Sequence, residues 1–242
     1  MEYTNQLKKY IRSLHVHKYR QKYNKFIAEG PKICNEFLQS TYNISHIICT
    51  SEWATNSTIP SSFSGHLIIV KQAELQQLST LNRANQVLCL IDRPEKKSLT
   101  CAGWMLYLDK IQDPGNMGTI IRTADWFGIT HICISPDTVD VYNPKVIQAS
   151  MGSHIRHNFF TLEVSELISL EYPLYGLTLN GESIKQVNPS SGFIIVGNES
   201  KGIRPELMEK LHHKLTISRL GKAESLNAAV AFGIACHQLI GN

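Results

Sequence analysis

The chain contains no apolar run long enough to span a bilayer, and its N-terminus has no signal-peptide core. None of its six cysteines forms a Cys-x-x-Cys pair, and most lie inside apolar runs such as Ile47-Ile48-Cys49. This pattern disfavours zinc and favours reduced thiols packed in a core. Together these absences predict a cytoplasmic protein that needs neither a membrane nor a metal.

Several common nucleotide and hydrolase motifs are also missing. No Gly-x-Gly-x-x-Gly follows an apolar strand, no Gly-x-x-x-x-Gly-Lys-Ser/Thr loop occurs, and no Gly-x-Ser-x-Gly turn is found. These absences disfavour a dinucleotide-dependent dehydrogenase, an NTPase with a phosphate-binding loop, and a serine hydrolase of the α/β type.

The composition is that of a globular protein with a mildly basic surface. Of 242 residues 43% are hydrophobic, and the formal net charge is +4. Such a charge permits a nucleic-acid partner without requiring one. Many of the cations crowd the first 25 residues, and their run is equally typical of an RNA-binding surface and of a solvated helix face. These residues are Lys8, Lys9, Arg12, His15, His17, Lys18, Arg20, Lys22 and Lys25.

Apolar strands alternate with helical segments along the whole chain, which predicts an α/β protein. Residues 1–25 are expected to form one basic helix, Pro31 should open the next, and 55–65 should be a loop. The polar stretch 92–98 carries a proline and lacks an apolar period, so the predicted domains are 1–97 and 98–242. Strands are expected at 25–30, 46–50, 67–70, 86–91, 104–108, 130–134, 159–161, 174–178, 192–196 and 214–217. In the second domain these strands predict a parallel sheet covered on both faces.

One helix, between Asp113 and Gly128, carries an unusual set of residues. Asn116 is expected to cap it and Gly128 to end it, while an apolar face that includes Ile120 and Ile121 packs inward. Gly118 and Arg122 are four residues apart, so they share the other face. A cation beside bare backbone suits the approach of a phosphate or a ribose.

Two further polar loops follow predicted strands, at residues 197–202 and 218–227. Ligands of open α/β sheets bind outside the carboxyl ends of the strands, so these loops are expected to converge with the start of the helix at Asp113. Taken singly, their residues have ordinary explanations. Glu199 could be a turn residue, Arg122 a surface ion-pair former, and Ser225 the N-cap of a final helix running to Ile240.

The three loops in combination are far more specific. Asn116-x-Gly118-x-x-x-Arg122, then Gly197-Asn198-Glu199-x-x-Gly202, then Ser225-Leu226-Asn227 resemble the motifs of the SpoU (TrmH-like) family of RNA ribose methyltransferases, within the SPOUT superfamily. This resemblance covers about residues 104–242. The segment 20–31 looks like the start of that family's N-terminal substrate-binding domain, an α/β domain whose fold is similar to that of ribosomal protein L30e.

The resemblance implies an enzyme that transfers a methyl group from S-adenosylmethionine to a ribose 2′-hydroxyl in RNA, without a metal. It implies a deep trefoil knot over about residues 192–228 and a homodimer through the C-terminal domain. Arg122 is then either the base or a phosphate anchor. The remaining implied site residues are Asn116, Glu199, Ser225 and Asn227 for catalysis, and Thr178, Gly197, Ile217 and Leu226 for the cofactor.

Ribosomal RNA is the first expected substrate, and transfer RNA the second. A non-catalytic RNA-binding protein of the same fold is the alternative. The presence of Asn116, Arg122, Glu199, Ser225 and Asn227 argues against that alternative. A nucleotide-binding enzyme acting on small molecules is disfavoured by the basic N-terminal segment and by the separate N-terminal domain.

Overall fold

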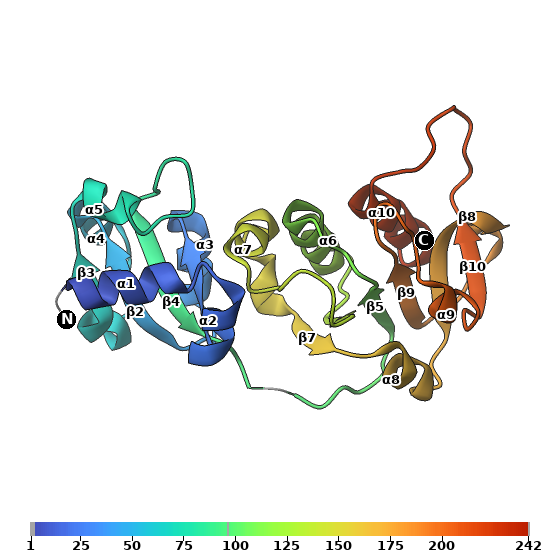
Figure 1. Ribbon diagram of the computed structural model, residues 1–242, viewed down its shortest axis with the longest axis horizontal. Helices are drawn as coiled ribbons and strands as arrows, with labels where there is room; N and C mark the ends of the chain where they lie inside the picture. The colour runs from blue at the N-terminus through green and yellow to red at the C-terminus, as the bar shows by residue number, and fades with distance from the viewer. Residues whose placement is uncertain (1–2, 96, 242) are drawn as a thin grey trace. The chain divides into compact units, whose positions relative to one another are not determined.

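The computed structural model describes residues 3–95 and 97–241 (Figure 1). The described chain forms two compact units. The first unit combines residues 3–95 with the segment 140–155, and the second combines residues 97–139 with 156–241. The division of function between 1–97 and 98–242 stays a prediction.

The first unit is built on a mixed sheet of four strands in the order β1-β4-β2-β3. β4 runs antiparallel to both β1 and β2, and β3 is parallel to β2. Side chains alternate along β1, so Phe26 and Ala28 enter one hydrophobic cluster and Ile27 enters another on the opposite face. The strands are β1 (Lys25–Glu29), β2 (Ile44–Cys49), β3 (Leu67–Ile69) and β4 (Val87–Asp92).

Helices of the first unit differ from the sequence prediction in two places. The expected single basic helix is two helices, because the chain breaks at Leu14–Val16, and the expected loop 55–65 contains helical turns. Pro31 does open a helix, as predicted. The elements are α1 (Asn5–Ser13), α2 (His17–Tyr23), α3 (Pro31–Leu38), α4 (Ser51–Asn56), η1 (Ser61–His66) and α5 (Gln72–Gln76).

The segment 140–155 is fastened to the first unit by charge and by packing. The Asp140 carboxylate accepts hydrogen bonds from Arg20 Nε and from Arg93 Nη2, each at 2.8 Å. The helix of this segment, α7 (Pro144–Ser150), packs against β1, and Ile147 enters the hydrophobic cluster of Phe26. Arg20 is 1% exposed, so its charge depends on Asp140 for compensation.

The second unit is built on six strands in the order β10-β8-β9-β5-β6-β7. Every pairing in this sheet is parallel, which confirms the sequence prediction. The strands are β5 (Trp104–Leu108), β6 (His131–Ile134), β7 (Asn158–Thr161), β8 (Leu174–Ser183), β9 (Gly192–Val196) and β10 (His213–Thr216). The helices of this unit are α6 (Pro114–Trp126), α8 (Val164–Ser169), η3 (Ile184–Gln186), α9 (Pro205–Met208) and α10 (Ala228–Leu239), and η2 (Ser153–Arg156) lies where the chain passes from the first unit to the second.

Two features of this sheet position the site. β5 and β9 are neighbours in register, with Leu108 beside Val196, so the segments that follow these two strands start side by side. The chain then continues through β10 at the sheet edge and returns to α10, which packs against α6. The predicted knot involves this part of the chain and stays a prediction. Between β9 and β10 the described chain forms the short helix α9.

Candidate active site

The start of α6 exposes the Asn116 side chain for contacts beyond its own helix. Asp113 is the N-cap, and its carboxylate accepts the backbone N–H of Asn116 at 2.8 Å. Pro114 at the first helical position suits this arrangement, because the missing proline N–H needs no partner there. The prediction that Asn116 caps the helix is therefore wrong. The predicted end is correct in substance, since Gly128 follows the Phe127 C-cap at φ +73°.

The loop after β9, residues 197–204, is closed on itself and tied to the end of β5. Asn198 and Gly202 exchange backbone hydrogen bonds of 3.0 and 2.9 Å. The Asn198 side chain donates to the carbonyl oxygen of Lys110 at 2.9 Å and accepts the backbone N–H groups of Ser200 and Lys201. At Gly197 a Cβ would clash with the backbone of Gly202 and of the next residue, so this tight closure requires glycine.

Three side chains from three loops meet beside this closed loop. Asn116 Nδ2 donates to Glu199 Oε1 at 2.9 Å, and Asn227 Nδ2 donates to Asn116 Oδ1 at 2.8 Å. These contacts confirm that the three loops converge at the carboxyl ends of the strands. We call Asn116, Glu199 and Asn227 the polar trio.

Asn227 has a second role at the start of the last helix. Its Oδ1 atom accepts the N–H groups of Ala229 and Val230, at 2.9 and 3.3 Å, so Asn227 is the N-cap of α10. The prediction that Ser225 caps this helix is therefore wrong. One amide side chain thus both starts α10 and joins it to the polar trio.

Arg122 and Ser225 are not joined to the polar trio within the described chain. Both are exposed, and neither makes a hydrogen bond or ion pair there. The expected patch of bare backbone beside Arg122 is absent, because Gly118 is buried. The Arg122 guanidinium is therefore exposed and makes no polar contact with the described residues.

The cofactor candidates lie in the middle of β8, directly after β9 and β10, and just before α10. Gly176 of β8 pairs with Ile195 of β9, which puts Thr178 and Gly197 two residues further along neighbouring parallel strands. Thr178 Oγ1 donates to Asn180 O at 2.9 Å, and its longer contact to Leu215 O, 3.5 Å away, brings it beside β10.

The other two candidates are apolar. Ile217, directly after β10, is partly buried, and Leu226, directly before Asn227, is 48% exposed. A set that combines apolar side chains, a threonine hydroxyl and a close-packed glycine fits a ligand that has an apolar aromatic face and polar edges. These residues therefore fit an adenine-containing cofactor.

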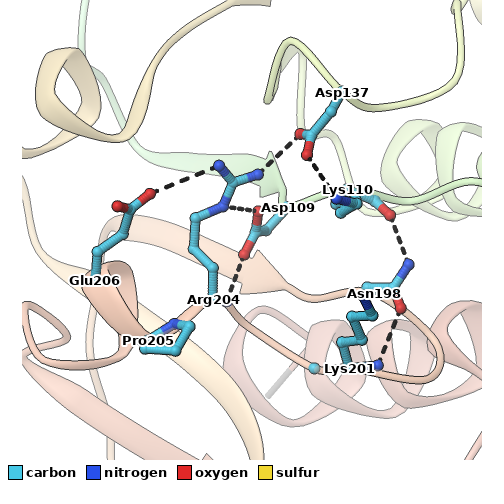
Figure 2. Close-up of a pocket in the computed structure, with 9 residues that line it drawn as sticks. Asp109, Lys110, Asp137, Asn198, Lys201, Arg204, Pro205 and Glu206 are labelled. Carbon is cyan, nitrogen blue, oxygen red and sulfur yellow. Dashed lines mark hydrogen bonds and ion pairs between the residues drawn. The ribbon is translucent and has the colours of Figure 1, made fainter.

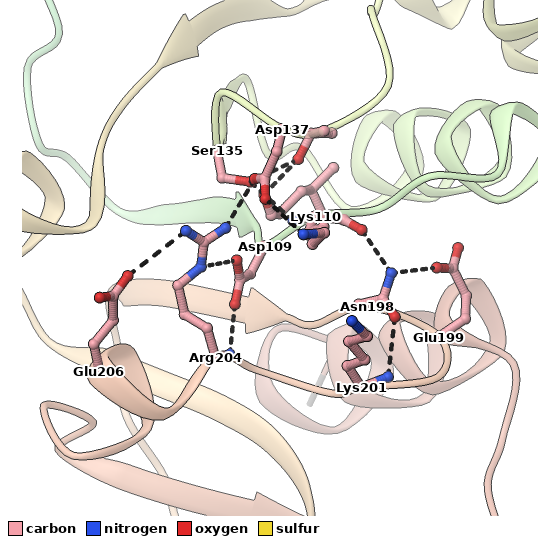
Figure 3. A network of polar contacts seen from close by, with 11 residues as sticks. Asp109, Lys110, Ser135, Asp137, Asn198, Glu199, Lys201, Arg204 and Glu206 are labelled. Carbon is pink, nitrogen blue, oxygen red and sulfur yellow. Dashed lines mark hydrogen bonds and ion pairs between the residues drawn. The ribbon is translucent and has the colours of Figure 1, made fainter.

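An ionic network lies at the ends of β5, β6 and β9 (Figure 3). Asp109 is 1% exposed and accepts two hydrogen bonds from Arg204, one from the backbone N–H at 2.7 Å and one from Nε at 2.6 Å. Arg204 Nη2 also donates to Asp137 Oδ1 at 2.8 Å, and Lys110 Nζ lies 3.2 Å from the other oxygen of Asp137.

Hydrogen bonding within this network shifts two ionisable groups. Hydrogen bonds from Ser135, Lys110 and Arg204 hold the pKa of Asp137 well below its usual range, although burial opposes this shift. Burial alone lowers the pKa of Arg204, but its hydrogen bonds to Asp109 and Asp137 outweigh this and raise it above the usual value. Both groups therefore stay charged near neutral pH.

The same network forms one side of a cavity of about 490 Å³ (Figure 2). Its walls include Asn198 and Lys201 of the closed loop, together with Arg204 and Glu206. Sequence reasoning missed the network. The available signal was Asp109, an acidic residue placed directly after the apolar strand Trp104–Leu108.

In residues 3–95 and 97–241, no group of three or more histidine, cysteine, aspartate or glutamate side chains is arranged to hold a metal ion. No helix in these ranges combines the length and apolarity that a membrane crossing needs. The six cysteines are free thiols.

The parallel sheet, the converging loops and the polar trio together define an RNA methyltransferase of the SpoU type. The sequence profile of the SpoU rRNA Methylase family matches residues 103–237, and that of the MRM3-like substrate binding domain matches residues 5–89. The chain belongs to the SpoU rRNA methylase family, which confirms the resemblance seen in the sequence.

Known proteins resemble the chain over nearly its whole length. It is 33% identical to the 23S rRNA (guanosine(2553)-2′-O)-methyltransferase RlmP of Bacillus subtilis, over 98% of this chain and 97% of that one. The structure of a putative RNA methyltransferase of the TrmH family from Porphyromonas gingivalis superimposes with a TM-score of 0.89 at 32% identity, covering 98% and 97% of the two chains. An AdoMet-bound rRNA methyltransferase from Sinorhizobium meliloti shares the fold, with a TM-score of 0.88 at 23% identity over 98% and 96%.

Proposed function

We propose that this protein transfers the methyl group of S-adenosylmethionine to a ribose 2′-hydroxyl of ribosomal RNA. The observation that carries this proposal is the polar trio, in which side chains from three separate loops meet through two hydrogen bonds. Such an arrangement holds a substrate hydroxyl in one orientation, which is what the reaction demands. The name of the B. subtilis relative supports ribosomal RNA ahead of transfer RNA.

The chemistry needs help on the side of the nucleophile. A ribose hydroxyl is a weak nucleophile at neutral pH, whereas the sulfonium of S-adenosylmethionine is already an activated methyl donor. The protein must place the hydroxyl in line with the methyl group and stabilise the charge that develops on oxygen. The polar trio supplies the placement, and Ser225, two residues before Asn227, is the nearest further hydroxyl on that loop.

Arg122 supplies the positive charge in this proposal. A guanidinium is a poor proton acceptor but a strong partner for phosphate, so we favour a role in holding the phosphate beside the methylated ribose. Its exposed side chain has no carboxylate partner among the described residues. The same charge stabilises the developing alkoxide once RNA is bound.

The cofactor is held by the middle of β8 and by the segments that follow β9 and β10. Gly197 and Thr178 offer backbone groups, while Ile217 and Leu226 offer apolar contacts to the adenine. Burying Leu226 under the cofactor removes apolar surface from water and so contributes to binding. No residue in this set needs a metal ion to act.

The N-terminal unit is proposed to bind the RNA. Residues 3–28 contain no aspartate or glutamate, and Lys9, Arg12, Lys18 and Lys22 are exposed on its first two helices. Exposed cations that form no ion pair with the described acidic side chains attract a phosphate backbone. The match to a substrate binding domain over residues 5–89 supports this role. An RNA substrate and free thiols also fit a cytoplasmic protein.

A homodimer through the C-terminal unit is part of the proposal. Trp126 of α6 is 85% exposed, and Val230 and Ile234 of α10 are 51% and 39% exposed, although the two helices pack together. Apolar side chains exposed on neighbouring helices are typical of a surface that another chain covers. Replacing Val230 with aspartate should give monomers in light scattering, whereas the same change at Ser165, which is exposed on α8 and lies outside these two helices, should not.

The test of the activity is the methylation of ribosomal RNA taken from a strain that lacks the protein. We expect labelled S-adenosylmethionine to give an alkali-resistant dinucleotide from one site. Arg122→Ala should abolish transfer and leave cofactor affinity nearly unchanged, and Lys210→Ala, which removes an exposed cation elsewhere in the unit, should retain activity. Normal cofactor binding without any RNA methylation would instead support a non-catalytic RNA-binding protein.

A further inference from the structure

The Asp109 carboxylate is buried and therefore needs a positively charged partner, which is Arg204. The carboxylate is 1% exposed at the end of β5, where an unpaired charge is strongly destabilising. Arg204 donates to both of its oxygens, one from the backbone N–H and one from Nε. The backbone bond fixes where the chain lies at residue 204, and the side-chain bond fixes the direction of the guanidinium.

The Arg204 guanidinium then ties further strand ends to the same point. Nη2 donates to Asp137 in the loop after β6, and Nη1 lies 3.6 Å from Glu206. Asp137 in turn accepts from Ser135 at 2.7 Å. One planar guanidinium therefore joins the segments that follow β5, β6 and β9, a geometry that the single ammonium of lysine cannot reproduce (Figure 3).

The closed loop is held at both ends, and Glu199 lies between the two anchors. Asn198 fixes one end through the carbonyl oxygen of Lys110 at 2.9 Å, and Arg204 fixes the other through Asp109. Between these anchors the Glu199 carboxylate accepts the Asn116 amide, which in turn accepts the Asn227 amide. Because Asn116 belongs to α6 and Asn227 caps α10, a shift of the loop would displace Glu199 from the other two members of the polar trio.

We propose that Asp109 and Arg204 are positioning residues that set the polar trio for methyl transfer by fixing the loop that carries Glu199. This rests on the proposed function. Neither residue contacts the polar trio directly, so neither is a catalytic residue. Their effect passes through the loop backbone, and misplacement of a reacting group by about 1 Å costs on the order of 100-fold in rate.

The kinetic test compares Arg204→Lys with Glu206→Gln. Arg204→Lys keeps the charge near Asp109 and loses the planar fork, so the protein should fold, while kcat should fall about 30- to 100-fold. The KM for RNA should change less than threefold. Glu206→Gln alters only the outer, 3.6 Å contact of the same guanidinium and should leave kcat within twofold.

A double variant separates positioning from general stability. Combining Arg204→Lys with Glu199→Gln should reduce kcat no further than Glu199→Gln alone, because the first change acts through the second residue. Independent reductions that multiply in the double variant would overturn the proposal. So would a wild-type kcat in Arg204→Lys.

A measurement that does not depend on catalysis allows this proposal to be tested separately from the proposed function. In NMR spectra of the full chain, the Asn116 side-chain amide should shift in Arg204→Lys, as it should in Glu199→Gln, and should not shift in Glu206→Gln. If the wild-type protein methylates no RNA, the proposed function fails while this test still decides the positioning role. An unshifted Asn116 amide in Arg204→Lys would refute that role.

Discussion

The loop 197–204 and the loop 217–226 lie in the same unit and carry residues of the same proposed site, but their structures differ. The first is closed by the Asn198–Gly202 pair and anchored at both ends. In the second, residues 218–226 are all exposed, and Arg219 Nη1 reaches only Ala223 O, at 3.4 Å. Figure 1 shows this loop standing out between β10 and α10.

The difference indicates that the two loops have different roles in the proposed site. Glu199 on the first loop is set before any ligand binds, because its hydrogen bonds already exist. The second loop buries little apolar surface, so we expect its order to depend on what binds against it. A site built from one fixed part and one ligand-dependent part orients the reacting groups and still admits a large cofactor.

The first unit shows a similar contrast between a fixed and an exposed residue, in two cations of α2. The largest effect on stability is expected there. Arg20 is held by Asp140, whereas Lys18 is exposed. Arg20→Gln leaves the carbonyl oxygens of Leu14 and His15 without their donor and leaves Arg93 as the remaining arginine on Asp140, so it should lower the free energy of unfolding by about 2–4 kcal/mol. Lys18→Gln should change it by less than about 0.5 kcal/mol. Urea denaturation checks both, and equal small effects would remove the distinction between the two cations.

The next largest effect concerns the fixed loop. Asn198→Ala removes its anchor on Lys110 O and the acceptor of two loop N–H groups, so kcat should fall about 100-fold. Ser218→Ala, in the exposed loop, is the matched control and should leave kcat within twofold. Wild-type turnover in Asn198→Ala would show that the anchors do not matter for catalysis.

A third change tests whether the exposed loop becomes ordered on the cofactor. Leu226→Ala should weaken cofactor binding by about tenfold, because less apolar surface is buried, with little effect on the melting temperature, because Leu226 is 48% exposed without ligand. Calorimetry gives the affinity. Hydrogen exchange should show cofactor-induced protection over 218–226 and little change over 198–203. Equal protection of both loops before cofactor is added would contradict this picture.

RNA affinity should respond to the exposed cations alone. Neutralising Lys9, Arg12, Lys18 and Lys22 together should weaken RNA binding and flatten its salt dependence, by about one unit of log–log slope for each phosphate that the protein no longer neutralises. Filter binding across a series of salt concentrations measures this slope. An unchanged slope would make these residues a solvated surface. Arg20 is left out of this set, because it is buried.

The smallest effect is expected from a change of pH. The histidine that causes it lies outside both loops, because neither loop contains a histidine. Burial lowers the pKa of His157 in the folded protein. The unfolded chain therefore binds more protons at this residue, and stability should fall as pH drops below about 6.5. The melting temperature should decline from pH 7.5 to 5.5, less steeply in His157→Gln. A melting temperature that rises on acidification would contradict this sign.

The sequence predicted the strands and the meeting of the loops better than it predicted individual side chains. Continuous apolar strands such as Gly192–Val196 can only be buried on both faces, so the parallel sheet followed from composition. Cap positions were less certain, because Asp113 and Asn116 are both good caps, as are Ser225 and Asn227. Tertiary contacts decided in each case which side chain caps the helix and which is free for other bonds.

Long-range charge pairing could not be predicted at all. The partner of Arg20 is Asp140, 120 residues further along the chain, and that of Asp109 is Arg204, 95 residues away. Nothing in the local pattern distinguishes Arg20 from the exposed cations near it. Burial of one partner decides which charges pair, and burial is a property of the folded chain.

The pairing of Arg20 with Asp140 has a consequence for engineering. Specificity is often altered by exchanging the substrate-binding module of one enzyme for that of a relative, with a single junction placed in the linker. Here a junction near residue 95 would transplant the first unit without its strand-covering helix α7 and without the counter-ion of a buried arginine. A working chimera would have to carry residues 140–155 from the same parent as residues 3–95.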